Sequence, residues 1–193
     1  MNLDKLKTKY IGRNIINYEV IDSTQKEAWR LVKKNIPNGS ILITEFQTSG
    51  IGTHGRKWHT DFSGNIAFSI IIYPNCNINK LKTITLDIAK MIVQIFKDLY
   101  HINLEIKHPN DIVINGKKLG GILTETKLLG EQVKSLVIGI GININEGFNE
   151  EIKDIATSIK KEFGLEVCRE EIIAEICNML EVYLDSSNTH HTV

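Results

Sequence analysis

The residues best suited to chemistry form one glycine-rich, cationic loop, Gln47 to Trp58, which follows the apolar run Ile41-Leu42-Ile43. Three glycines within six positions of this loop can take positive φ and turn backbone amides inward, which creates a concave surface for an anion. Arg56 and Lys57 add positive charge at the end of the loop. The pattern therefore predicts a loop that encloses an acid and a nucleotide phosphate. The alternative is a flexible surface loop.

The spacing Gly50-x-Gly52-x-x-Gly55 also fits the glycine fingerprint of dinucleotide-binding proteins. That fold requires a helix directly after the glycines, but residues 56–64 show no helical period. No strand ending in an acidic residue follows at about 20 positions either. The fingerprint is therefore rejected for this chain.

Composition narrows the range of functions. The chain has 193 residues, of which 42% are hydrophobic, and this length suits one domain. Lys+Arg and Asp+Glu both number 23, so no general basic field indicates nucleic-acid or membrane-surface binding.

Cys76, Cys168 and Cys177 are odd in number and form no C-x-x-C, which argues against a disulfide framework or a zinc site. With no apolar run near about 18 residues, we expect a soluble cytoplasmic protein.

Apolar periodicity predicts the elements that position the loop. The predicted strands are 14–21, 40–46, 65–73, 104–107, 112–114 and 135–145, and the predicted helices are 25–34, 81–99, 151–163 and 169–184. Asn115-Gly116 is a strong hairpin signal, which places Lys118 at the start of a strand. We expect a single domain over 1–185, followed by a polar tail over 186–193.

Several of these residues have a purely structural interpretation as well. Ser23 and Thr24 are good capping residues for the helix that follows them. A lysine at the position of Lys118 is often a solvated edge residue. Gly139 and Gly141 lie inside a predicted strand, where glycine indicates close approach of a ligand or of another part of the backbone.

Five separated segments together resemble the catalytic domain of biotin protein ligases. In chain order they are Asp22-Ser23-Thr24, Gln47 to Trp58, Lys107 to Asp111, Lys118 to Leu123, and Gly139 to Asn143. The resemblance covers roughly residues 14–184 in the family's order and spacing. It implies an α+β fold related to class II aminoacyl-tRNA synthetases, with a mixed sheet and helices packed mainly on one face.

The resemblance also implies a two-step reaction. The biotin carboxylate would attack the α-phosphate of ATP, with Mg²⁺ present, to give biotinyl-AMP and pyrophosphate. A lysine on the biotin carboxyl carrier domain of a biotin-dependent carboxylase would then attack the mixed anhydride. No covalent enzyme nucleophile is needed. Relatives often form dimers through sheet edges, and the resemblance is compatible with a homodimer.

Site residues follow from the matched motifs. Lys118 and Arg56 would be the catalytic cations, with Lys118 between the biotin carboxylate and the α-phosphate. The residues implied around biotin are Ser23, Thr24, Gln25, Gln47, Gly50, Ile51, Gly52, Thr53, Lys118, Gly120, Gly121, Gly139 and Gly141. Those implied around ATP are Arg56, Lys57, Trp58, Asn110, Asp111, Lys118 and Asn143, with Asp111 as a magnesium ligand. Trp58 could be a core residue or an aromatic wall, and we favour the core.

The loop departs from the family pattern Gly-Arg-Gly-Arg-x-Gly-Arg. Ile51 and Thr53 stand at the two earlier arginine positions, so only Arg56 remains, and we expect weaker retention of the adenylate. Gln25 replaces the usual asparagine, and His108 replaces a common tryptophan. We also expect no N-terminal helix-turn-helix segment, and not most of the small C-terminal β-barrel of some relatives.

Two other functions remain as alternatives. An octanoyl or lipoyl transferase shares the fold, but those enzymes resemble a different glycine loop. A non-catalytic sensor that holds biotin or an adenylate would account for the missing arginines. Arg56, Lys118 and the Pro-Asn-Asp segment favour the ligase over the sensor.

Overall fold

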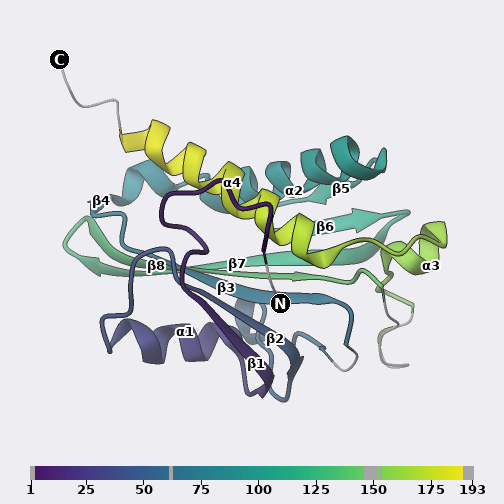
Figure 1. Cartoon of the computed structure of the whole chain (residues 1–193), viewed down its shortest axis with the longest axis horizontal. Coiled ribbons are helices and arrows are strands. Elements are labelled where there is room, and N and C mark those ends of the chain that lie inside the picture. The colour runs from purple at the N-terminus through teal and green to yellow at the C-terminus, as the bar shows by residue number, and fades with distance from the viewer. Residues whose placement is uncertain (1–2, 61–62, 146–151, 153, 189–193) are drawn as a thin grey trace.

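A mixed β-sheet forms the centre of the computed structural model (Figure 1), which describes residues 3–60, 63–145, 152 and 154–188. Its strands are β1 (Ile15–Ile21), β2 (Ile41–Gln47), β3 (Ile66–Ile72), β4 (Cys76–Asn77), β5 (Glu105–Lys107), β6 (Asp111–Ile114), β7 (Lys117–Leu129) and β8 (Gln132–Ile142). The order is β1-β2-β3-β8-β7-β6-β5, and β4 pairs with the start of β8. The pair β1 and β2 is parallel, and the other named pairs are antiparallel.

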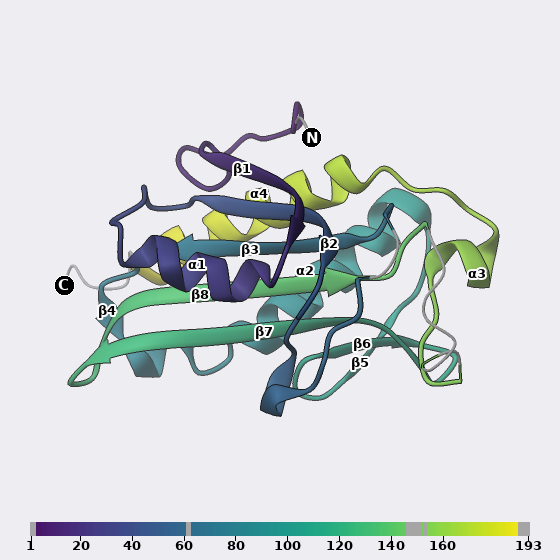
Figure 2. The same ribbon diagram turned by 90° about the horizontal axis from the view of Figure 1, so that it is seen from below.

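Helices cover the two faces of the sheet unequally (Figures 1 and 2). The long helices α2 (Ile84–Tyr100) and α4 (Arg169–Asn188) lie together on one face, and α1 (Thr24–Val32) lies alone on the other. The short helix α3 (Ile159–Phe163) sits near one end of the sheet. The predicted α+β architecture, with helices mainly on one face, is confirmed.

Strand alternation divides the buried residues into a large and a small core. Phe68 of β3 and Ile140 of β8 belong to the large core with α2 and α4. Leu42, Ile71 and Val137 point the other way and pack against Ala28 of α1. Successive side chains of a strand alternate between faces. Beyond Ile71 of β3 and Val137 of β8, the next residues that face α1 are smaller.

Those smaller residues are Ser69, Gly139 and Gly141. Ser69 and Gly139 lie beside Gln25 at the N-terminal end of α1, and Gly141 lies under Trp58. Apolar side chains therefore fill the space under α1. The smaller residues leave a shallow region of the sheet at the N-terminal end of the helix. This shallow region is the floor of the candidate site.

Local sequence signals predicted several structural details correctly. Asn115 and Gly116 both have positive φ, 49° and 75°, and form the tight turn between β6 and β7. The Ser23 Oγ accepts a hydrogen bond from the Lys26 amide at 3.4 Å and caps α1. Gly164 ends α3 in the left-handed conformation with φ of 66°.

The helix predicted over 151–163 begins only at Ile159, so that prediction is wrong for the described residues before it. Ala156 instead forms a parallel bridge with Lys118 of β7, and Ser158 caps α3. Apolar residues three and four positions apart are typical of a helix, but in the structure this segment pairs with the sheet through its backbone. Glu151 itself lies outside the described residues.

The last helix is longer than predicted. α4 continues to Asn188 rather than ending at Leu184, and the rest of the expected polar tail, 189–193, lies outside the described residues. Within the part of the chain that the structure describes, no helix is both long and apolar enough to cross a bilayer.

The N-terminal segment is fixed to α4 by the buried carboxylate of Glu181. Its oxygens accept hydrogen bonds from the amides of Lys9 (2.5 Å), Tyr10 (3.0 Å) and Ile11 (2.9 Å). Burial works to raise the pKa of Glu181, but these backbone donors hold the pKa below its usual value of 4.5. The charged form is therefore the one that the fold stabilises.

We expect Glu181→Ala to lower the free energy of unfolding by about 2–3 kcal/mol at pH 7, because backbone donors lose a charged acceptor. A pKa that is lower in the folded state adds stability that is fully present above the unfolded-state value and is lost as the pH falls through the folded value. The difference between wild type and variant in urea denaturation should therefore shrink below about pH 4.5.

Glu175→Ala on the same helix is the control, because the Glu175 carboxylate accepts from the Asn178 side-chain amide. A similar loss in both variants, or a difference that persists unchanged at low pH, would contradict this role for Glu181.

Candidate functional site

Two side chains rest on glycines of β8 and form the floor of a cleft. A Cβ at Gly139 would lie 2.6 Å from Gln25 Oε1, and a Cβ at Gly141 would lie 2.3 Å from the Trp58 ring. The sequence indicated close approach of a ligand or another backbone at these glycines, but the close neighbours are protein side chains. A Cβ at Gly120 would meet the Gly141 carbonyl oxygen at 2.8 Å, so there the backbones themselves approach.

The glycine-rich loop is closed by its own backbone. Ile51 and Lys57 form an antiparallel bridge, the Gly52 amide donates to the Arg56 carbonyl at 2.7 Å, and the Trp58 amide donates to the Gly50 carbonyl at 2.9 Å. The expected concave surface of inward-turned amides is therefore wrong for these donors. Of the three loop glycines, Gly55 has positive φ, at 72°. A Cβ at Gly50 would lie 2.4 Å from the Trp58 carbonyl oxygen, which explains that glycine sterically.

Thr53 organises the polar side chains of the loop. Its Oγ1 accepts from Arg56 Nη2 at 2.8 Å and from Asn110 Nδ2 at 3.4 Å. The threonine that replaces a family arginine thus holds the remaining arginine, whose side chain is otherwise exposed.

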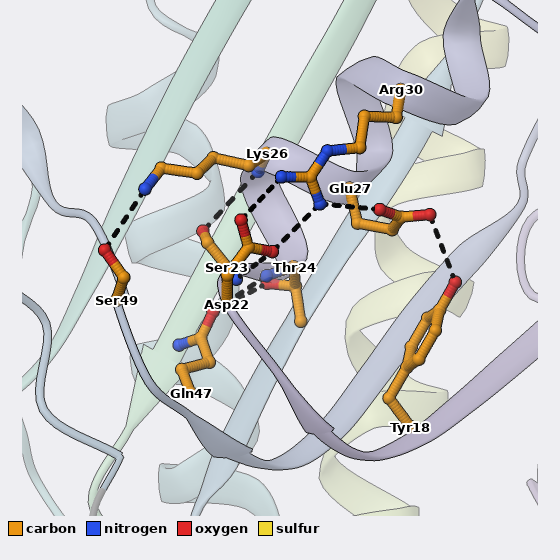
Figure 3. A network of polar contacts seen from close by, with 9 residues as sticks. All are labelled: Tyr18, Asp22, Ser23, Thr24, Lys26, Glu27, Arg30, Gln47 and Ser49. Atoms are coloured by element: carbon orange, nitrogen blue, oxygen red, sulfur yellow. Dashed lines mark hydrogen bonds and ion pairs between the residues drawn. The ribbon is translucent and has the colours of Figure 1, made fainter.

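A buried polar network lies behind the cleft at the start of α1 (Figure 3). The Gln47 Oε1 accepts from the Thr24 amide at 2.9 Å, and Gln47 Nε2 donates to Thr60 Oγ1 at 3.0 Å. The Ser69 hydroxyl donates to Thr24 Oγ1 at 2.9 Å. Gln47 thus joins the backbone of Thr24 to the Thr60 hydroxyl.

Hydrogen bonds connect the start of α1 to the loop, and an ion pair within α1's N-terminal region supports them (Figure 3). Arg30 contacts the Asp22 carboxylate at 2.5 Å, and this hydrogen bond lowers the pKa of Asp22 to about 2. The Asp22 carbonyl accepts from the Ser49 amide at 2.8 Å, and Lys26 Nζ donates to Ser49 Oγ at 3.1 Å. The beginning of the loop therefore moves with α1.

Lys118 is held through both its backbone and its ammonium group. Its amide donates to the Ile155 carbonyl at 2.8 Å, and its carbonyl accepts from the Thr157 amide at 2.9 Å. Its Nζ contacts Asp111 Oδ1 at 2.7 Å and lies 5.7 Å from the centre of a Trp58 ring. These contacts hold the ammonium group of Lys118 at the cleft.

The first cavity lies next to α1, and its empty space of about 430 Å³ is partly open to solvent. The predicted biotin-site residues that line it are Thr24, Gln25, Ile51, Gly52, Thr53, Lys118, Gly121, Gly139 and Gly141. Trp58 and Asn110, predicted for the nucleotide, line it as well. Ser23, Gln47, Gly50 and Gly120 are not among its lining residues and support it from behind.

The second cavity, with about 670 Å³ of empty space, adjoins the first. The predicted nucleotide-site residues that line it are Arg56, Lys57, Trp58, Lys118 and Asn143. Asp111 lines neither of these cavities and reaches them through Lys118. Gly52, Thr53, Trp58 and Lys118 line both cavities and so form their junction.

Trp58 is a wall between the cavities, and our preference for the core interpretation was wrong. It is partly exposed and lies outside both apolar cores of the described residues. Its indole covers Gly141 because no Cβ fills that space.

The sequence did not identify several lining residues of the site. The first cavity is also lined by Phe68, Ile122, Leu123 and Ile140, and the second by His59, Ile152, Ile155 and Ala156. Strand alternation could have placed some of the first group near the cleft, but Ile155 and Ala156 lie in a segment whose pairing with Lys118 is nonlocal. His54 and His108 line a third cavity that shares Thr53 and Asn110 with the first.

A metal ion would find few ligands here. Among the described residues, no three acidic, histidine or cysteine side chains gather to hold one. Asp111 is a single carboxylate that is already paired with Lys118. Mg²⁺ in nucleotide sites commonly takes one or two carboxylates from the protein and its other ligands from substrate phosphates and water.

Comparisons with known proteins identify one family. The model of the biotin/lipoate A/B protein ligase family matches residues 18–143. The bifunctional ligase/repressor BirA of Bacillus subtilis is 38% identical over 188 residues, which cover 96% of this chain and 58% of that protein. The chain thus spans less than two thirds of the length of this relative.

A solved structure shows the same fold. The biotin protein ligase from Aquifex aeolicus, in complex with biotin and ATP, is similar with a TM-score of 0.75 and 29% identity. The match covers 90% of this chain and 71% of that one.

We expect Gly141→Ala to displace Trp58, because the new Cβ would overlap its ring while the strand is held on both sides by β3 and β7. The loss in stability should be about 1–3 kcal/mol, as for other overpacked sites. Tryptophan emission should shift to longer wavelength, and urea denaturation should give the stability change.

Gly52→Ala is the matched control, since its backbone is extended and its new Cβ would lie 3.5 Å from the nearest atom. An unchanged emission spectrum in Gly141→Ala would mean that Trp58 does not rest on Gly141.

Proposed function

This chain belongs to the biotin/lipoate A/B protein ligase family, and we propose that it activates biotin with ATP and transfers it to a lysine of a biotin carrier domain. The observation that carries this proposal is the pair of adjoining cavities that meet at Lys118 and Trp58. One cavity suits a small acid with a polar ring, and the other suits a nucleotide. Their junction is where the two substrates would react.

The first cavity has the character of a biotin site. Thr24 and Gln25 supply polar groups at the α1 end, and Ile51 and Leu123 supply apolar walls. A few placed polar groups among apolar side chains are typical of small-molecule sites. Biotin would place its ureido ring against the polar groups and its carboxylate toward Lys118.

The second cavity has the character of a nucleotide site. Arg56 and Lys57 supply positive charge for phosphates, while Ile155 and Ala156 supply apolar surface for a base. Asn143 lines the same cavity, and its Nδ2 donates to the Thr157 carbonyl at 3.1 Å. That bond leaves the amide oxygen of Asn143 for other partners.

The chemistry requires charge neutralisation more than a nucleophile. A carboxylate oxygen of biotin forms a bond to the α-phosphorus, and the bond to pyrophosphate breaks. Both reactants are anions, so a fixed cation between them lowers their repulsion and aligns them. Lys118 lines both cavities and is therefore the residue placed to do this.

Transfer needs little further help from the protein. The neutral ε-amine of the carrier lysine attacks the anhydride carbonyl, the bond to AMP breaks, and the amine proton passes to solvent. Lys118 and Arg56 would stabilise the departing AMP.

Asp111 is the carboxylate that fits a magnesium ion brought by ATP. Mg²⁺ is commonly held by one or two carboxylates together with substrate phosphates, so one aspartate suffices. Such an ion would neutralise phosphate charge. Asp111 would then share its oxygens between that role and its contact with Lys118, at 2.7 Å in this structure.

Intact-mass analysis of a biotin carrier domain, incubated with this protein, MgATP and biotin, tests the function. We expect a mass increase of one biotin, and we expect Lys118→Ala to abolish both this product and pyrophosphate release. Lys117→Ala, one residue earlier on β7, is the control for loss of a lysine and should remain active.

Octanoate and lipoate run in parallel separate the related activities. Modification by either acid instead of biotin would show that the protein is an acyl transferase of the same fold and not a biotin ligase. Biotin binding without pyrophosphate release would indicate a sensor. A fully active Lys118→Ala variant would refute the mechanism.

Thr53→Val tests the arrangement of Arg56. Because the hydroxyl that accepts from Arg56 is lost, we expect the KM for ATP to rise about three- to tenfold, corresponding to one hydrogen bond. Thr53→Ser keeps the hydroxyl and should stay close to wild type. Equal KM values for ATP in Thr53→Val and wild type would show that Arg56 is positioned by other contacts.

A further inference from the structure

Glu125 of β7 lies next to the first cavity and has no role in the mechanism above. Its Oε2 accepts two hydrogen bonds, from Gln25 Nε2 at 2.9 Å and from Trp29 Nε1 at 2.7 Å. Both donors belong to α1, so the carboxylate joins the helix to the sheet beside the ligand cavity. Its contact with Gln25 reaches a residue that lines that cavity.

These contacts determine which end of the Gln25 amide faces the cavity. The Gln25 Nε2 lies near two acceptors, Glu125 Oε2 at 2.9 Å and the Val137 carbonyl at 3.4 Å. Rotating the amide by half a turn would place its oxygen against both of them, which is electrostatically unfavourable. Gln25 is 3% exposed, so solvent cannot compensate. The amide oxygen must therefore point toward Gly139 and the cavity.

The neighbouring hydroxyls leave this region able to accept a donor. The Ser69 hydroxyl lies 3.1 Å from Gln25 Oε1 and 2.9 Å from Thr24 Oγ1, but it has one hydrogen to donate. The Thr24 hydroxyl donates its own hydrogen to Gln47 Oε1 at 3.3 Å, whereas the amide oxygen of Gln25 has two lone pairs and keeps one of them even when Ser69 donates to it. A ligand with an N–H group would supply the missing hydrogen bond.

We propose that Glu125 is a positioning residue for specificity: by fixing the Gln25 amide, it makes the cavity select ligands that present an N–H donor, as a cyclic urea does. This inference rests on the proposed function, in which the ligand is biotin. An acid with a purely hydrocarbon chain offers no such donor and would leave buried acceptors unpaired.

A double-mutant cycle on biotin binding tests the proposal without requiring catalysis. The dissociation constant for biotin is measured by calorimetry for wild type, Glu125→Met, Gln25→Met and the double variant. We expect Glu125→Met to weaken binding about tenfold in the wild-type background, because the Gln25 amide is released. In the Gln25→Met background the same change should have an effect of less than about twofold, since no amide remains to orient.

Kinetics provide a second measurement that a merely structural role would not reproduce. Glu125→Met should raise the KM for biotin while kcat for pyrophosphate release stays near the wild-type value. Glu125→Gln keeps the shape and one neutral oxygen, so its effect on binding should be smaller, about threefold. If Glu125→Met fails to fold, this second variant and its combination with Gln25→Met carry the test.

Glu131→Met is the matched control. The Glu131 carboxylate also accepts from a side-chain amide, that of Asn77 at 2.9 Å, and lies at the far end of the same hairpin. We expect it to leave biotin binding unchanged.

The outcomes separate this inference from the proposed function. Equal effects of Glu125→Met in both backgrounds, or no effect in either, would overturn the role of Glu125 while leaving a biotin ligase intact. Biotin binding that follows the expected cycle without pyrophosphate release would support Glu125 and overturn the ligase. A wild-type protein that does not bind biotin would overturn both.

Discussion

The absence of Cβ atoms at Gly139 and Gly141 is the constraint on which the cleft depends. Gln25 and Trp58 occupy the space that two ordinary residues of β8 would fill. One side chain comes from the start of α1 and the other from the end of the glycine-rich loop. The same pair of glycines therefore draws two distant segments onto one strand and sets how deep the cavities between them are.

Lys118 illustrates how a flexible side chain becomes a fixed charge. The hairpin turn at Asn115-Gly116 sets where β7 begins, and the strand-like contacts with Ile155 and Thr157 hold the lysine backbone from the other side. Asp111 then holds the ammonium group through a contact of 2.7 Å. The lysine thus loses most of its rotational freedom before any substrate arrives.

Sequence patterns predicted features whose causes lie within a few residues of each other. The turn at Asn115-Gly116 and the cap at Ser23 are of this kind, and the family resemblance supplied the mixed sheet and most residues of both cavities. The failures have nonlocal causes. Trp58 lines the site because Gly141, far along the chain, leaves space for it, and residues before Ile159 are not helical because Lys118 offers backbone partners. Neither cause is visible in a sequence window.

Glu181 has a consequence for how the chain is made. It anchors Lys9, Tyr10 and Ile11 across sequence separations of 172, 171 and 170 residues. On the ribosome, the opening segment must wait without its carboxylate partner until synthesis has passed the middle of α4. Contacts of such long range slow folding, because chain entropy is lost before they form. Lys9, Tyr10 and Ile11 are thus among the last of the described residues to reach their native contacts.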